Sequence, residues 1–174
     1  MKLKYLVYAA LAAFSANGVY AASAGPTDPQ IAAIVVTANQ VDIDAGKLAT
    51  TKAQSGEVKD FAQLMIANHT EVNKAAKDLV TKLHVTPEEN ATSKSLKDGG
   101  DKNLASLKTL SGGAFDKAYM DHEVTYHQAV IDAVDKTLIP SAQNAQLKGL
   151  LEQARPTFVT HLEHAKQVQA MLSK

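Results

Sequence analysis

The sequence contains no cysteine and no tryptophan, and its basic and acidic side chains balance at 18 each. The absence of thiols excludes disulfides, thiolate metal sites, cysteine catalysis and a lipid-modified N-terminal cysteine. The balanced charge provides no basic face for nucleic acid and no basic run for a membrane surface. The fold must therefore be stabilised by a hydrophobic core, which about 150 residues are enough to form.

Familiar catalytic motifs are missing as well. The sequence has no glycine-rich phosphate loop, no nucleophile-elbow serine and no HExxH. No acidic residue stands three positions before any histidine, so the Glu-x-x-His pairs of di-iron bundles are absent and a ferritin-type ferroxidase is not expected. The sequence thus leans away from an enzyme, and an oxidoreductase that uses a bound metal is a third option.

The first residues have the pattern of an export signal. A short basic start and an apolar run of ten residues (5–14) are followed by small residues. This order is typical of a secretory signal peptide cut after Ala21 or Ala24, and the run is shorter than the roughly 20 residues of a membrane-spanning helix. We expect residues 1–24 to be removed on export to the periplasm, leaving one domain, 25–174, without a transmembrane segment. An uncleaved anchor is the alternative.

Residues 58–83 carry the clearest helical pattern in the chain. Apolar side chains recur there at steps of three, four and seven, which places them on one face of an α-helix. His69 lies four residues after Met65 and three before Val72, so an imidazole stands on the same apolar face. The apolar members of this face are Val58, Phe61, Met65, Val72, Ala76, Leu79 and Leu83.

The first half of the domain is predicted to form a helical hairpin. One helix spans about 29–52, with Asp28 as its N-cap and Pro29 in its first position. Ser55 is expected to cap the following helix, 56–84. Because the connection is very short, the two helices should be antiparallel neighbours.

The second half repeats this arrangement. A third helix is predicted from about 114 to 138 and ends before Pro140. A fourth helix, 144–172, contains Pro156, which should kink it because proline removes one backbone hydrogen bond and crowds the preceding turn.

The connection between the two hairpins, 86–112, is predicted to be partly helical. Thr86 and the following proline and glutamates resemble a helix start, whereas the segment 98–100 (Asp-Gly-Gly) is expected to break the helix. No stretch alternates long enough to form a strand. The prediction is therefore an all-α fold, a four-helix up-and-down bundle with a partly helical crossover between its second and third helices.

Each long helix places one polar residue on its inner face: Asp42, His69, His127 and His161. At 1.5 Å per residue, Asp42 and His69 lie level, both about 20 Å from the first turn. His127 and His161 are predicted to be offset by roughly 9 Å along the axis, and Glu123 would match His161 better. Glu123 is therefore kept as a substitute candidate.

These five residues have two interpretations. Imidazole with carboxylate suits Fe, Cu or Zn, so they could hold a transition metal ion inside the bundle. Alternatively, Asp42 and His69 form a hydrogen-bonded polar layer in a non-catalytic envelope or stress-related structural protein. The sequence indicates no protein partner and no particular metal.

Three stretches carry short patterns in a fixed order. They read DIDAGKLATTKAQSGEVKDFAQLMIANH, FDKAYMDHEVTYH and RPTFVTHLEHA. Together they resemble an exported bacterial family known as domain of unknown function 4142, over about 29–172. Its members are ferritin-like helical proteins, often labelled outer membrane proteins, without a settled activity, so the resemblance implies fold and export and leaves function open.

The sequence departs from the family pattern at two positions: the usual glutamate of the first helix is Asp42 here, and Asn68 stands where an aspartate is common. The matching positions are Asp42, Ile43, Gly46, Phe61, Ala62, Met65, His69, Phe115, Asp116, Tyr119, His127, Pro156 and His161.

Overall fold

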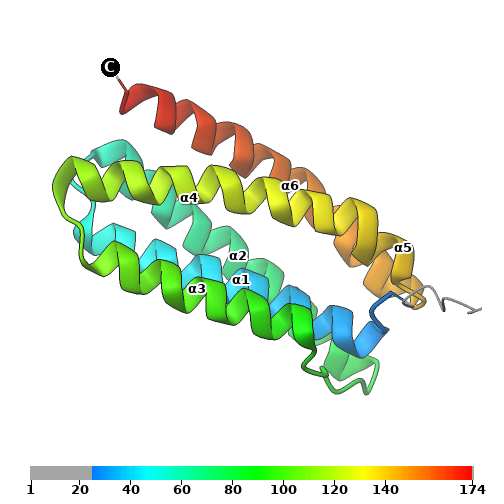
Figure 1. Ribbon diagram of the computed structural model, residues 1–174. Coiled ribbons are helices and arrows are strands. Elements are labelled where there is room, and N and C mark those ends of the chain that lie inside the picture. Colours follow the sequence, from blue (N-terminus) through cyan, green and yellow to red (C-terminus); the bar gives the residue numbers. More distant parts are fainter. Residues whose placement is uncertain (1–24, 174) are drawn as a thin grey trace, which may run out of the picture.

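Helices dominate the part of the chain that the computed structural model describes, residues 25–173 (Figure 1). No strand occurs within these residues, so the predicted all-α bundle is confirmed. The expected signal peptide, residues 1–24, lies outside the described residues. The elements are α1 (Asp28–Lys52), α2 (Gly56–Lys82), α3 (Ala91–Lys108), α4 (Gly112–Ala133), the π-helical segment η1 (Val134–Leu138), α5 (Ile139–Ser141) and α6 (Ala145–Met171).

The first hairpin forms as the sequence predicts, with one change at its start. The Ser55 side chain accepts a hydrogen bond from the Val58 backbone N–H and caps α2. The N-cap of α1 is Thr27 instead of Asp28. The Asp28 carboxylate accepts hydrogen bonds from the backbone N–H groups of Gln143 and Asn144, both at 2.9 Å. It therefore ties the start of α1 to the loop before α6, a long-range role that local capping rules do not reveal.

The crossover differs from its prediction, because it contains one uninterrupted helix. Asn90, instead of Thr86, caps α3 through its side-chain oxygen. The helix then runs through Gly99 and Gly100 and packs along α1 (Figure 1). A Cβ atom added to Gly100 would lie only 2.7 Å from a methyl carbon of Val41. The second glycine thus provides close helix contact and does not break the helix.

The second hairpin is longer than predicted. Beyond α4 the chain continues through the five residues of η1 and through α5, and it leaves helical structure only after Ser141. Pro140 lies in α5 directly after η1 and has no N–H to donate, whereas the N–H of the preceding Ile139 still bonds the Val134 oxygen. The rod that carries His127 is therefore extended toward the loop before α6.

The hydrophobic core is divided into two clusters. One lies where α1 and α6 end and α2 and α4 begin, and it includes Phe61, Met65, Phe115 and Tyr119. The other lies at the opposite end of these helices and includes Phe158. Between them lies a layer of buried polar side chains from α1, α2, α4 and α6. Within residues 25–173 no helix combines the length and apolarity that a membrane span requires.

Neighbouring glycines in α3 provide a direct test of the α1–α3 packing. Gly100→Ala should destabilise the protein relative to Gly99→Ala by about 1–3 kcal/mol, because the new methyl group overlaps the short, branched Val41 side chain. Gly99→Ala meets no atom within 4 Å and gains helix propensity of about 1 kcal/mol. Urea denaturation of both variants measures the difference, and equal midpoints would show that α3 does not pack on α1 in this way.

Candidate metal centre

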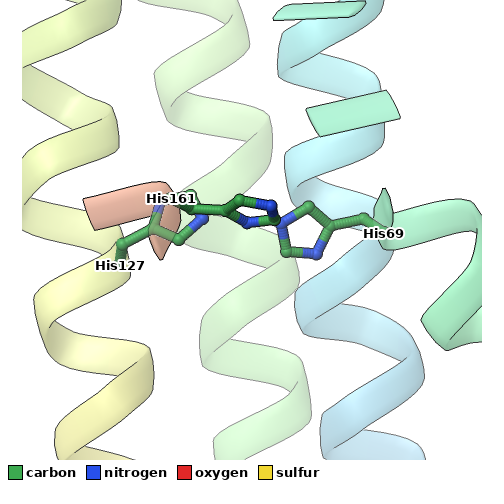
Figure 2. A group of neighbouring side chains, drawn as sticks. All are labelled: His69, His127 and His161. Atoms are coloured by element: carbon green, nitrogen blue, oxygen red, sulfur yellow. The ribbon is translucent and has the colours of Figure 1, made fainter. Parts of the chain in front are cut away.

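The four helices of the bundle each contribute to one buried polar cluster. Asp42 comes from α1, His69 from α2, Glu123 and His127 from α4, and His161 from α6. All five side chains are at most 3% exposed. Figure 2 shows the three imidazole rings pointing toward one another from three different helices. The structure thus brings together all five residues that the sequence singled out.

The three histidines lie close enough to share one ligand. Their ring centroids are 5.6 Å apart for His69 and His127, 5.1 Å for His69 and His161, and 5.3 Å for His127 and His161. One nitrogen from each ring lies within 4.8 Å of the others, and Asp42, Glu123 and His127 form a second such group. His127 belongs to both groups, so the imidazole and carboxylate sets are contiguous.

The predicted offset between His127 and His161 is wrong. Their rings lie side by side, with centroids 5.3 Å apart. The prediction ended the third helix near Leu138, but the helical rod continues through η1 and α5 to Ser141. The longer rod moves the loop away from His127 and brings it level with His161. Glu123 is therefore a neighbour of His127 and does not replace it.

In His69 and His127, Nδ1 is hydrogen-bonded to an oxygen and Nε2 faces Asp42. His69 Nδ1 lies 2.6 Å from the side-chain oxygen of Asn39, to which it donates. His127 Nδ1 lies 3.0 Å from the backbone oxygen of Glu123 and donates to it. Donation from Nδ1 leaves the lone pair of the neutral ring on Nε2. Within the described chain, His127 Nε2 has no hydrogen-bond partner, whereas His69 Nε2 lies 2.7 Å from the Asp42 carboxylate.

His161 is held in the reverse orientation. Its Nε2 lies 2.9 Å from the side-chain amide of Asn68, whereas its Nδ1 finds no hydrogen-bond partner among residues 25–173. As placed, Asn68 Nδ2–H donates to Nε2, so the hydrogen of the neutral ring is on Nδ1; an amide rotated by 180° would reverse both roles. Each of the three rings therefore has one nitrogen held by a neighbouring residue, and one nitrogen of each ring lies within 4.8 Å of the other two.

Asp42 brings a negative charge to this space. Its Oδ2 lies 2.7 Å from His69 Nε2 and 3.4 Å from His127 Nε2. Burial by itself would raise the pKa of Asp42, but His69, followed by His127 and His161, outweighs burial and lowers the pKa to about 2. A carboxylate oxygen and an imidazole lone pair at this distance repel each other unless a proton or a metal ion lies with them. A proton on the imidazole or a bound metal ion would each satisfy this contact.

The other members of the cluster differ in charge. Burial, followed by repulsion from Asp42, raises the pKa of Glu123 to about 8, so its carboxyl group is protonated at neutral pH. Burial opposes the charge on His127, but the contacts with Glu123 and Asp42 outweigh it and raise the pKa of His127 to about 9. Burial and the two other histidines lower the pKa of His161 to about 3, which keeps it neutral. A neutral imidazole is the form that binds metals.

Asn39 and Asn68 each contact a histidine of the cluster, and the sequence did not predict either residue as part of the site. Asn39 lies three residues before Asp42, so helical spacing could have placed it on the same face. Asn68 lies next to His69 in sequence, and because adjacent helical residues diverge, its contact with His161 on α6 could not be inferred. The remaining histidines near the site do not join it: His122 stacks on Tyr126 and His164 packs against Phe61.

The pKa of Glu123 predicts how stability changes with pH in the presence of a chelator. The folded-state pKa of about 8 lies above the ordinary 4.5, so the protonated form stabilises the fold. That stabilisation is complete below 4.5 and is lost as pH rises through about 8. Glu123→Gln, which mimics the protonated carboxyl, should lose about 1–3 kcal/mol less stability than wild type between about pH 5 and pH 8. Urea denaturation along this pH series measures it, and parallel curves would contradict the charge assignment.

Comparison with solved structures supports the description of the fold. The chain resembles a structure described as CopM in the Cu(II)-bound form, with a TM-score of 0.64 and 16% sequence identity. The similarity covers 84% of this chain and 97% of that chain. At this level of identity the likeness establishes a shared fold.

Sequence comparison gives the family. No curated protein matches the chain. The model of one family, described as Domain of unknown function (DUF4142), matches residues 14–168. This match includes all five residues of the polar cluster and every long helix up to Val168, and the chain therefore belongs to the DUF4142 family.

Proposed function

We propose that this protein binds a transition metal ion in the centre of its helical bundle. The donors are His69 Nε2, His127 Nε2, one ring nitrogen of His161 and the carboxylate of Asp42. Glu123 lies behind His127, with Oε2 3.4 Å from Nδ1, and its carboxyl group is a further oxygen donor once it loses its proton. Three nitrogens and one oxygen form a donor set that suits Cu, Zn or Fe.

The observation that carries this proposal is the convergence of three imidazoles and one carboxylate. Buried polar groups are nearly always hydrogen-bonded, yet His127 Nε2 and His161 Nδ1 have no hydrogen-bond partner in the described chain, and His69 Nε2 has only the Asp42 carboxylate, at 2.7 Å. The opposite nitrogen of each ring is held by Asn39, Asn68 or a backbone oxygen. Such outer contacts orient the histidine ligands of metal sites and fix their tautomers.

Copper is the ion to test first. Among divalent ions of the first transition row, Cu(II) binds most tightly to a given nitrogen and oxygen site. The structure of similar fold was also solved in a Cu(II)-bound form. Zinc accepts the same donors in a tetrahedral arrangement, so Zn(II) and Fe(II) are the comparison ions.

We place the mature domain, residues 25–174, in the periplasm on the basis of the N-terminal sequence pattern. We also propose that it is ferritin-like in its organisation, because inward side chains of facing helices build the site and a long connection joins the second and third bundle helices.

The alternative function is a non-catalytic envelope or stress-related structural protein. It is favoured by the 2.7 Å approach of Asp42 and His69, because a protonated His69 would form a buried ion pair there. In this case the polar layer fixes the register of the helices and no metal is required. The two functions differ in whether the protein retains a metal ion.

Metal analysis of His161→Ala tests the proposed site. Wild-type protein purified without a histidine tag should hold about one Cu(II) per chain, and the variant should bind at least about 100-fold more weakly because it lacks one direct donor. His161 is preferable to His69, since loss of His69 would leave the buried Asp42 charge without its nearest partner and cost about 3–5 kcal/mol. Calorimetric titration measures affinity and stoichiometry.

His164→Ala is the matched control, because His164 lies one turn further along α6 and contacts Phe61 instead of the cluster. It should bind Cu(II) like the wild type. Equal, substoichiometric metal in wild type and His161→Ala would remove the metal-binding function and leave the structural alternative.

Asn39 provides a second test, which concerns the outer contacts. Asn39→Ala removes the acceptor for His69 Nδ1–H and should weaken Cu(II) binding about 10–100-fold. Asn39→Asp keeps an oxygen in this position and should retain most of the affinity. Identical affinities for both variants would show that Asn39 does not orient His69 for metal binding.

A further inference from the structure

A cavity of about 290 Å³ lies beside the polar cluster, on the side of the Phe158 half of the core. Its walls come from α1, α2, α3, α4, η1 and α6, so it is set into the bundle and is not a shallow surface depression. The lining is almost entirely apolar and includes Ile34, Val130, Leu150 and Phe158.

Two features of the sequence create this space. Four alanines, Ala38, Ala129, Ala133 and Ala154, line it where larger side chains would fill it. In addition, η1 replaces regular helix at one wall, and π-helical turns inside α-helices frequently occur at functional sites. Ala129 and Ala133 are exposed, which places the opening of the cavity along the last turns of α4.

The inner end of the cavity reaches the polar cluster. His69, His127, Asn39 and Tyr126 are its polar lining residues near the centre of the bundle. The Tyr126 hydroxyl already donates to the backbone oxygen of Ala38 at 2.8 Å, and Asn39 is engaged by His69. Among these lining residues of the described structure, His127 keeps an Nε2 without a hydrogen-bond partner, and the Nε2 of His69 has only the Asp42 carboxylate beside it. The cavity is therefore apolar along its length and polar at its closed end.

We propose that this cavity binds a small, uncharged apolar molecule that carries one polar head, with the head against His69 and His127. An apolar body matches the walls, whereas the free imidazole nitrogens offer hydrogen bonds or a metal ion to the head. Ligand sites in proteins commonly combine an apolar pocket with a few convergent polar groups.

The volume sets the size of the ligand. An apolar cavity of about 150 Å³ holds one benzene molecule, so about 290 Å³ corresponds to roughly two fused aromatic rings or a comparable alkyl chain. A larger ligand would extend through the opening beside Ala133. A bare ion or a sugar would leave the apolar walls without favourable contacts.

The apolar part of the ligand would bind the cavity walls with or without a metal. Whether its polar head meets a metal ion or an imidazole rests on the proposed function. With a metal ion present, the head would be a ligand of that ion. With the metal removed, it would hydrogen-bond to an imidazole. The two proposals can therefore fail separately.

Naphthol is a suitable probe, and naphthalene is its analogue without a polar head. In the presence of a chelator, naphthol should bind the protein and shift the ring resonances of His69 and His127 in NMR spectra. Naphthalene should bind more weakly and shift these resonances less. Ala133→Trp, which places an indole across the opening, should weaken naphthol binding at least about tenfold.

Ala75→Trp is the matched control, because Ala75 is an exposed alanine of α2 that does not line the cavity. It should bind naphthol like the wild type, and both tryptophan variants should bind Cu(II) normally. No naphthol binding, or equal binding by Ala133→Trp, would overturn the cavity proposal whatever the result with metal. A change of oligomeric state in Ala133→Trp, measured by analytical ultracentrifugation, would instead indicate that a second copy of the chain covers this opening and would also overturn it.

Discussion

The buried carboxylate of Asp42 is the constraint on which the centre of this protein depends. Its charge lies in a core where an isolated ion would cost several kcal/mol, and imidazoles from two other helices, His69 and His127, lie against it. The nearest of them, His69, lies 2.7 Å away. Because these residues come from three different helices, the bundle must keep a single register for the charge to remain paired. The same requirement makes the site well defined in space.

The polar layer also divides the molecule into two functional halves. On one side, Phe61, Phe115 and Tyr119 pack with the aromatic contacts expected of a filled core. On the other side, alanines and a π-helical segment leave an open cavity next to the histidines. One half is therefore a filled core beside the polar cluster, while the other leaves a cavity that is lined in part by His69 and His127. A metal ion and an apolar molecule would meet at the boundary between the halves.

Protonation links the cluster to its surroundings. Glu123 and His127 hold protons at neutral pH, whereas His161 is neutral. These differences arise because burial penalises every charge, while Glu123 and Asp42 favour the charged form of His127 and the neighbouring histidines disfavour the charged form of His161. A metal ion entering the cluster would replace the proton on His127 and would balance the negative charge of Asp42 in its place. Metal ion and proton would therefore compete for the same position. In the structural interpretation a proton balances the charge of Asp42, and in the metal-binding interpretation a metal ion does so.

The sequence alone determined the helical fold and the members of the buried polar cluster, because both depend on local periodicity. The apolar stripe of 58–83 required a helix, and spacing along that stripe placed His69 inward. Helix lengths also made Asp42 and His69 level across a short turn. What the sequence could not decide was set by contacts between distant segments. Gly100 faces Val41, Asp28 binds the loop before α6, and the extension through η1 brings His127 level with His161. Propensity describes each segment by itself, whereas close packing, long-range hydrogen bonds and cavities exist only once the helices are assembled.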